Sequence, residues 1–190
     1  MNQMRAVRRA ALALAFAGTL AITTANLAHA EEIQCRGTIG AVTLDNVFVP
    51  DGVSCTLNGT RLIGTLKVGT GATLVANSVR VNGNIQAEGS ASVTVQGNSR
   101  VGGSVQIKQG DSASVRSTRI SGDLQFDEMQ GALSADRNVI GGNLQAFKNM
   151  GGLVLVSNRI AQNLQCKENA PPPTGGGNMA GSKEDQCAAL

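Results

Sequence analysis

The chain has 190 residues, with 16 Lys and Arg against 13 Asp and Glu, one His and 24 Gly. It has four Phe but neither Trp nor Tyr. The glycine content argues against a helical repeat protein, and the near absence of aromatic residues argues against sugar binding by ring stacking.

Residues 1–30 have the pattern of a cleaved signal peptide. Arg5, Arg8 and Arg9 precede an apolar run of small residues, and the segment ends in Ala-His-Ala at 28–30, which matches an A-x-A cleavage pattern. Polar Thr and Asn residues interrupt the apolar run, which argues against a membrane anchor. We therefore predict an exported protein, located in the periplasm, at the cell surface or outside the cell, with no transmembrane segment after cleavage.

Removal of this segment changes the charge balance of the chain. Three of the 16 basic residues are lost with it, which leaves 13 basic and 13 acidic residues. This balance and the scarcity of aromatics argue against a nucleic-acid partner. The single histidine, His29, is also lost, which excludes Ser–His–Asp and Cys–His catalysis as usually built.

Residues 31–60 precede the regular part of the sequence. The stretch TLDNVFVPDGVSCTLNGT at 43–60 resembles the later repeats less regularly. We expect residues 31–60 to form an N-terminal cap and a first, irregular coil.

Residues 61–166 repeat one short phrase with a period of 19 or 20 residues. It reads VNGNIQ at 81–86, VGGSVQ at 101–106, ISGDLQ at 120–125, IGGNLQ at 140–145 and IAQNLQ at 160–165. The first and fifth residues of each copy are apolar, the third is glycine except for Gln162, and the fourth and sixth are polar, an alternation typical of a strand with one buried face. A second alternating piece, such as VTV at 93–95, follows turn-forming residues in each unit.

A fixed period of this length predicts a repeat architecture. Leucine-rich repeats share the length, but their L-x-x-L-x-L pattern is missing, and a β-sandwich does not require identity between distant strands. We predict an all-β fold, a single-stranded right-handed parallel β-helix of about seven coils. The handedness follows the preference of parallel crossovers.

Residues 167–190 break the repeat with a segment rich in Pro and Gly, APPPTGGG at 170–177. Proline cannot donate a hydrogen bond to a neighbouring strand. We therefore expect a C-terminal cap that covers the last strand edge without extending it, with a flexible linker as the alternative.

Four cysteines follow the predicted signal peptide: Cys35, Cys55, Cys166 and Cys187. An even number in an exported protein favours disulfides. Spacings of 20 and 21 residues would stack the members of each pair on neighbouring strands, ~4.8 Å apart, within the range that a disulfide accepts. We predict the pairs Cys35–Cys55 and Cys166–Cys187. The alternative, a zinc site of all four cysteines, lacks a C-x-x-C pair.

The units GNIQAEGSASVTV and GGNLQ resemble the short glycine-plus-aliphatic repeats of bactofilins and other small bacterial β-helices. The segments VFVPDGVSCTLNGT and NRIAQNLQCKENAPPPTGGGN, with the cysteine that closes the tail, look like those of a group of exported bacterial repeat proteins of uncharacterised role. The likeness covers residues 43–187. Bactofilins are cytoplasmic scaffolds without a signal peptide or cysteines, so this chain departs from them in compartment.

Polar residues at fixed positions predict columns along the surface of the solenoid. The residue before the phrase is arginine in five of six copies, with Val139 as the exception: Arg61, Arg80, Arg100, Arg119 and Arg159. The last residue of the phrase is glutamine in five copies: Gln86, Gln106, Gln125, Gln145 and Gln165. We expect the glutamines to form a hydrogen-bonded ladder and both columns, with an Asn-rich column between them, to share one sheet face.

The arginine column has two interpretations. Like charges on neighbouring strands are destabilising, but charges ~5 Å apart in water repel by only about 1 kcal/mol, so the column is tolerable without a ligand. A row of guanidinium groups also suits the carboxylate, sulfate or phosphate groups of a polyanion.

The acidic residues are scattered, and only Asp123, Asp127 and Glu128 fall within one coil. A lyase or glycosidase would need clustered carboxylates, so we read these three as a solvated turn. We predict no catalytic residue, metal or cofactor.

The predicted function is that of a non-enzymatic structural or adhesive protein of the cell envelope or extracellular space. The alternative is a binding module for an anionic polysaccharide or other polyanion through the arginine and glutamine columns, and a degenerate polysaccharide lyase is the third. The predicted partners are an anionic glycan or further copies of the chain.

Overall fold

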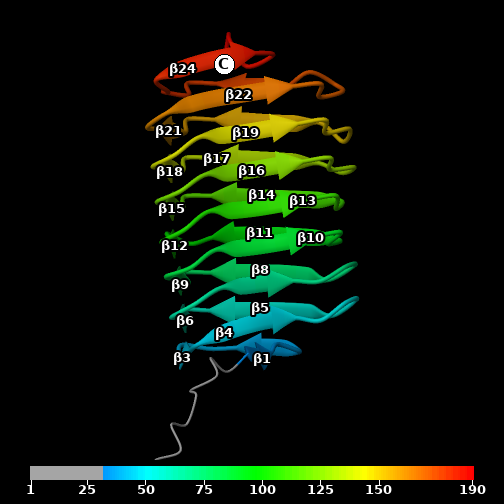
Figure 1. The fold of residues 1–190 in the computed structure, drawn as a ribbon, viewed down its shortest axis with the longest axis vertical. Helices are drawn as coiled ribbons and strands as arrows, with labels where there is room; N and C mark the ends of the chain where they lie inside the picture. Colours follow the sequence, from blue (N-terminus) through cyan, green and yellow to red (C-terminus); the bar gives the residue numbers. More distant parts are fainter. Residues whose placement is uncertain (1–31) are drawn as a thin grey trace, which may run out of the picture.

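Strands of successive repeats pair in parallel and in register along one continuous stack (Figure 1). The structure is a computed structural model that describes residues 32–190, and none of these residues is helical. The predicted all-β parallel solenoid is confirmed, with about eight coils instead of seven. The predicted signal peptide lies outside the described residues. Within them, no helix is long and apolar enough to span a membrane.

Three sheets form the sides of the stack; each of the first seven coils contributes one strand to every sheet, and the last three strands of the chain extend sheets A and B only. Sheet A contains β1 (Glu32–Gln34), β4 (Asn46–Val49), β7 (Leu66–Val68), β10 (Ile85–Glu88), β13 (Val105–Lys108), β16 (Leu124–Asp127), β19 (Leu144–Phe147), β22 (Asn163–Lys167) and β24 (Ser182–Asp185). Sheet B contains β2 (Gly37–Ile39), β5 (Ser54–Asn58), β8 (Thr73–Asn77), β11 (Ser92–Gln96), β14 (Ser112–Arg116), β17 (Leu133–Asp136), β20 (Leu153–Val156) and β23 (Thr174–Gly176). Sheet C contains β3 (Thr43–Leu44), β6 (Arg61–Leu62), β9 (Arg80–Val81), β12 (Arg100–Val101), β15 (Arg119–Ile120), β18 (Val139–Ile140) and β21 (Arg159–Ile160).

The repeated phrase is not one strand, as its alternation suggested, but spans a corner between two sheets. In the copy at 81–86, Val81 ends β9 and Ile85 begins β10, and the chain bends between them. Both side chains are buried, as expected. Gly83 lies at the bend, where a Cβ would be 2.7 Å from the carbonyl oxygen of Gly64. The backbones of stacked corners approach closely, which favours glycine there; the last copy has the exposed Gln162 at this position instead.

Side chains of different size fill the core along each column. Phe126 on β16 is fully buried, and in register with it lie Ile107 on β13 and the small Ala146 on β19. The other two aromatic residues of the described chain, Phe48 and Phe147, lie half-buried on the outer face of sheet A.

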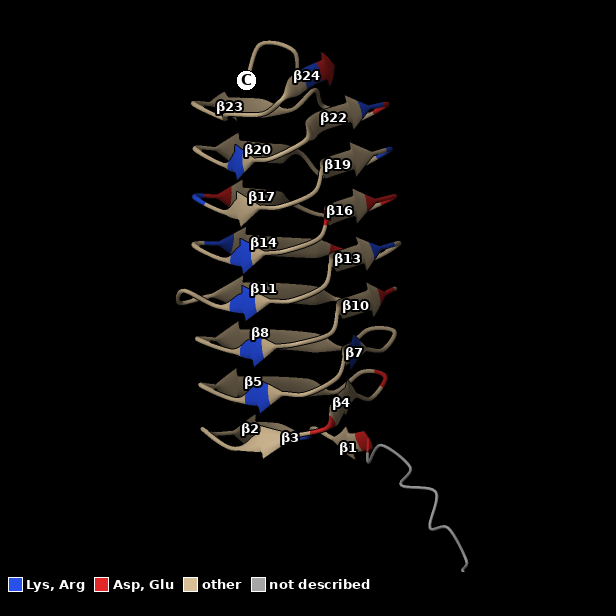
Figure 2. Cartoon of the chain, turned by 60° about the vertical axis from the view of Figure 1, so that its left-hand side comes forward, with Lys and Arg blue, Asp and Glu red and all other residues tan. Residues whose placement is uncertain are grey.

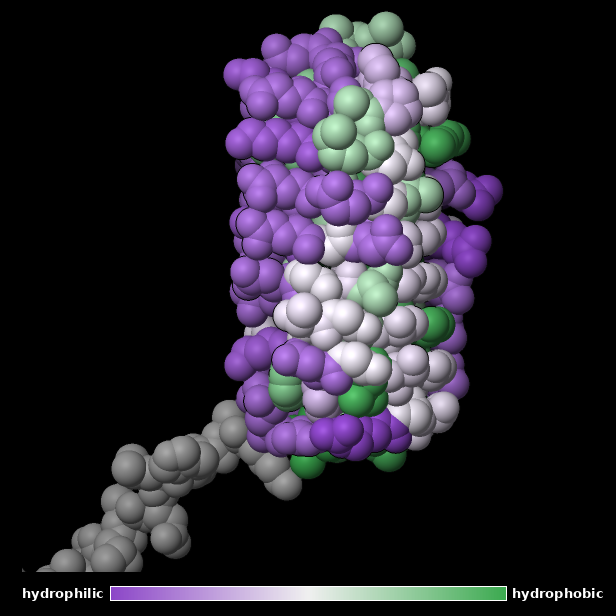
Figure 3. Space-filling model, turned by 90° about the vertical axis from the view of Figure 1, so that its right-hand side faces the viewer, coloured by the Kyte–Doolittle hydropathy of each residue, from purple (hydrophilic) through white to green (hydrophobic). Residues whose placement is uncertain are grey.

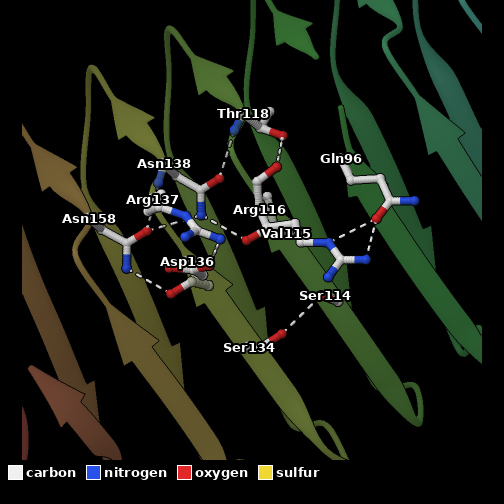
Figure 4. A network of polar contacts seen from close by, with 11 residues as sticks. Gln96, Ser114, Val115, Arg116, Thr118, Ser134, Asp136, Arg137, Asn138 and Asn158 are labelled. Atoms are coloured by element: carbon white, nitrogen blue, oxygen red, sulfur yellow. Dashed lines mark hydrogen bonds and ion pairs between the residues drawn. The ribbon is translucent and has the colours of Figure 1, made fainter. Parts of the chain in front are cut away.

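Buried asparagines form two ladders that the sequence analysis did not anticipate. Asn158 is 1% exposed, and its Oδ1 accepts hydrogen bonds from the backbone N–H and the Nδ2 of Asn138, at 3.1 and 3.0 Å. Its Nδ2 donates to the carbonyl oxygen of Ala135 and to Oδ1 of Asn178. Figure 4 shows Asn138 and Asn158 of this ladder. Asn149 and Asn169 form the second ladder by the same pattern. Each ladder satisfies backbone groups at a corner where the sheet hydrogen bonds stop.

The residue before each of these asparagines has a left-handed backbone conformation. Arg137 has a φ of 51° and Ser157 a φ of 54°, and this conformation turns the chain sharply from sheet B towards sheet C. Asparagine, serine or threonine fills the buried position after the turn in most coils, as at Thr118 and Ser99, and Val79 fills it in one.

Both predicted disulfides are confirmed. Cys35–Cys55 and Cys166–Cys187 have Cα–Cα distances of 5.7 and 5.3 Å, and no cysteine of the described chain is free. The zinc alternative is therefore wrong. Two disulfides indicate an oxidising compartment, as expected for an exported protein.

The expectation that the tail covers the stack without extending it is wrong. β23 pairs with β20 and β24 pairs with β22, both in parallel, so the tail adds further strands to sheets B and A. Its three prolines, at 171–173, lie in the turn before β23, where no ladder donor is needed. At the other end, residues 32–44 form a coil of three short strands, β1, β2 and β3.

Replacing Asn158 by Ala is expected to lower the free energy of unfolding by about 2–6 kcal/mol. The backbone N–H of Asn138 and the carbonyl group of Ala135 would lose buried partners, at about 1–3 kcal/mol each. Chemical denaturation measures this loss. Asn82→Ala is the matched control, because Asn82 is exposed and its side chain has no hydrogen bond among the described residues; we expect a change within about 0.5 kcal/mol. Equal effects of the two changes would contradict the ladder.

Candidate functional site

The glutamine column forms a continuous hydrogen-bonded ladder on the outer face of sheet A, as expected. Each Nε2 donates to the Oε1 of the glutamine on the next coil. The four links are Gln86 to Gln106 at 3.2 Å, Gln106 to Gln125 at 3.1 Å, Gln125 to Gln145 at 2.9 Å and Gln145 to Gln165 at 2.9 Å. These four links and a fifth, from Gln165 to Glu184, run in the same direction along the stack. The glutamine column therefore has a structural role, which explains why glutamine recurs at this position.

A carboxylate ends this ladder on the last strand, β24. Gln165 donates to Oε2 of Glu184 at 2.8 Å, and the hydroxyl of Ser182 donates to Oε1 at 2.6 Å. These two hydrogen bonds, that of Ser182 first, hold the pKa of Glu184 below its usual range, because they favour the charged carboxylate.

The Asn-rich column lies at the corner between sheets C and A and acts differently from the glutamines. The side-chain oxygen of each residue accepts the backbone N–H of the residue one coil further on: Oδ1 of Asn84 from Ser104 at 2.8 Å, and Oδ1 of Asp123 from Asn143 at 2.7 Å. These side chains stabilise the corner and are turned towards the backbone.

The arginine column lies on sheet C, where every strand has only two residues. Arg61, Arg80, Arg100 and Arg119 are direct neighbours on β6, β9, β12 and β15. Val139 follows on β18 and Arg159 on β21. Figure 2 shows these arginines as one column of positive charge along the stack, interrupted once. All five arginines are exposed.

The two columns do not share one face, and this part of the sequence analysis is wrong. The arginines lie on sheet C and the glutamines on sheet A, with the corner at Gly83 and its copies between them. The error follows from reading the phrase as one straight strand.

Several charged residues elsewhere on the described chain face opposite charges or amides on the next coil. Along the end of sheet A, Glu88 is in register with Lys108, and Lys108 with Asp127. On sheet B, Arg116 is in register with Asp136 and donates to Oε1 of Gln96 (Figure 4). Such alternation stabilises neighbouring strands.

The arginine column has no such opposite charge or amide on the neighbouring coils. Within residues 32–190, ion pairs join Lys67 to Glu32, Arg137 to Asp136 and Lys148 to Glu128, and none involves an arginine of sheet C. The side-chain hydrogen bonds of this part of the chain likewise include none of the five. The guanidinium groups of all five arginines therefore present their hydrogen-bond donors to solvent. The four consecutive arginines have other arginines as neighbours in sheet C, and Arg159 has Val139 as a neighbour.

Shallow grooves flank the column on both sides. One, of about 290 Å³, is lined by all four consecutive arginines together with Asn82, Gly102 and Ser121. The other, of about 480 Å³, lies towards sheet B and is lined by Arg100, Arg119, Arg137 and Val139 among others. Figure 3 views another side of the molecule, where a pale strip of small residues runs between hydrophilic borders.

The three acidic residues of the sixth coil do not form a cluster. Asp123 lies before β16 and Asp127 at its end, so the strand separates them. Asp123 accepts hydrogen bonds at its corner, and Glu128 lies 3.9 Å from Lys148. The described residues contain no group of three or more His, Cys, Asp or Glu that could hold a metal ion.

No family model, curated protein or solved structure matches the chain. The resemblance to bactofilin-like repeats stays a prediction, and the function has to be argued from the residues themselves.

Acid is expected to loosen the last strand before the rest of the stack. Because the folded-state pKa of Glu184 is lowered, its contribution to stability is full above its ordinary pKa of 4.5 and is lost as the pH falls through the lowered value. The protection factors of the β24 amides, which correct hydrogen exchange for its intrinsic slowing in acid, should fall over this range, and Glu184→Gln should remove that fall. If the variant kept the same acid sensitivity of β24, protonation of Glu184 would not be its cause.

Arg100→Gln is expected to raise the midpoint of thermal unfolding at low salt. Arg100 has a like charge on each side, and repulsion at ~5 Å is about 1 kcal/mol per pair in water. The gain should disappear at about 1 M salt, where the screening length is ~3 Å. Arg116→Gln is the control, since it removes a hydrogen-bonded arginine and should give no gain. A lower midpoint for Arg100→Gln at low salt would show that the column is not repulsive.

Proposed function

We propose that the protein is a non-enzymatic structural or adhesive element of the cell envelope or extracellular space. The observation that carries this proposal is the continuity of the stack: all three sheets run in register through the coils, and a disulfide lies near each end. Ladders at the corners satisfy buried polar groups along the same axis. Such a body suits mechanical support or the display of a long surface.

A second candidate is a binding module for an anionic polysaccharide or other polyanion. The uncompensated arginine column favours it, because stacked charges on sheets A and B, such as Glu88 with Lys108 and Arg116 with Asp136, have opposite signs. Exposed guanidinium groups pair with carboxylate, sulfate or phosphate in a bidentate manner. The glutamines take no part in this version of the site, since they bond to one another on a different sheet. A degenerate polysaccharide lyase is the least supported, because the acids of the sixth coil are apart or engaged.

Retention of the purified protein on alginate and heparin columns separates the two candidates. The binding module predicts retention that salt reverses and that the triple variant Arg80→Gln, Arg100→Gln, Arg119→Gln abolishes. A matched control removes three charges from other parts of the surface: Lys108→Gln, Lys148→Gln, Lys167→Gln. Equal loss of retention in both variants would show that only the overall charge of the protein matters, and the proposed site on the arginine column would be wrong. Concentration-dependent filaments in negative stain, without retention, would favour the structural role.

A further inference from the structure

We propose that the arginine column binds an unbranched polycarboxylate that lies parallel to the solenoid axis, one carboxylate per coil, and that Val139 limits the site to four anionic groups. This inference rests on the second function proposed above, the binding module. It adds the orientation, the class and the length of the ligand.

The orientation follows from the groove beside the column. A single groove of about 290 Å³ is lined by Arg61, Arg80, Arg100 and Arg119 together. These residues come from four successive coils and are stacked in register at the strand spacing of ~4.8 Å. A ligand that contacts all four must therefore run across the strands, along the axis of the stack.

The floor of the groove is formed by Asn82, Gly102 and Ser121, which follow the arginine strands on three successive coils. A Cβ on Gly102 would lie 2.4 Å from the carbonyl oxygen of Asn82, so close backbone stacking keeps this residue without a side chain in the middle of the groove. The guanidinium groups beside the floor are exposed.

The ligand class follows from charge and from the absence of aromatics. The planar guanidinium group matches the planar carboxylate with two parallel hydrogen bonds. One carboxylate per coil calls for a polymer with one acid on each repeating unit, as in a chain of uronic acids. Because the groove-lining residues include no aromatic ring, recognition rests on the spacing of charge, and the identity of the uronic acid should matter little.

The length follows from the interruption at β18. Four arginines are consecutive, Val139 occupies the next position, and Arg159 follows alone. A carboxylate above Val139 gains no partner, so the contacts of a polymer with the unbroken run end at the fourth unit.

Oligogalacturonates of one to eight units, titrated into the purified protein at low salt, test this inference by calorimetry. We expect affinity to rise about two- to fivefold for each unit up to four, the range for an exposed ion pair, and then to level off. Guluronate oligomers of the same lengths should give the same profile. Affinity that continues to rise at the same rate beyond four units would overturn the inference.

Val139→Arg would join the run of four to Arg159 and should move the plateau from four units to six. Val154→Arg is the matched control, because Val154 is 45% exposed on sheet B, and the added charge should leave the plateau at four. Arg100→Gln gives a second test that does not depend on the fold accepting a new arginine: it should shorten the unbroken run to Arg61 and Arg80 and move the plateau to two units.

The outcomes separate the inference from the function on which it rests. If oligomers bind but neither Val139→Arg nor Arg100→Gln moves the plateau, the limit of four units set by Val139 is wrong, and the proposed binding module stands. If no oligomer of any length binds while alginate is retained through the arginines, the axial arrangement is wrong. If neither oligomers nor polymers bind, both the inference and the binding module are overturned.

Discussion

The structure depends on one constraint: each residue lies over the residue 19 or 20 positions away, at the spacing of parallel strands. A side chain in this fold therefore faces a copy of itself or whatever replaces it in the next repeat. Glutamine and asparagine fit this constraint, because an amide both donates and accepts a hydrogen bond. Aliphatic residues fit it in the core. Arginine does not, because its guanidinium group only donates and always carries a charge.

This constraint gives the arginine column its significance. The glutamines are explained by their mutual bonds and the buried asparagines by the backbone groups that they satisfy. Acidic and basic residues alternate along the end of sheet A, from Glu88 to Lys108 to Asp127. Only on sheet C does the described chain place like charges in successive coils, beside a groove that all four consecutive arginines line. A bound polyanion would supply the negative charge that the protein itself does not provide there.

The sequence predicted the parts of the fold that depend on period and register alone. The period of 19–20 residues predicted the parallel stack, and the same arithmetic predicted the disulfides Cys35–Cys55 and Cys166–Cys187. The glutamine ladder followed because residues one period apart must meet. These predictions needed no knowledge of where the coil bends.

The features that depend on the bends were missed. Alternation through Val81, Gly83 and Ile85 looks like one strand, and only the close approach of stacked backbones at Gly83 shows that a corner lies there. Asn138 and Asn158 were not singled out, although their 20-residue spacing was a signal that they stack. The tail was read as a strand breaker because of its prolines, yet these fall in a turn and β23 and β24 continue the sheets.

Binding of a polycarboxylate along the arginine column is tested most directly by NMR, by following the Nε–H signals of individual arginines while a galacturonate tetramer is added. Axial binding to the arginine column predicts that the signals of Arg61, Arg80, Arg100 and Arg119 shift together and saturate at one tetramer per chain. The signals of Arg116, bonded to Gln96, and Arg137, paired with Asp136, should stay in place. Equal shifts of all six signals, or shifts of Arg116 and Arg137 alone, would contradict a site on sheet C.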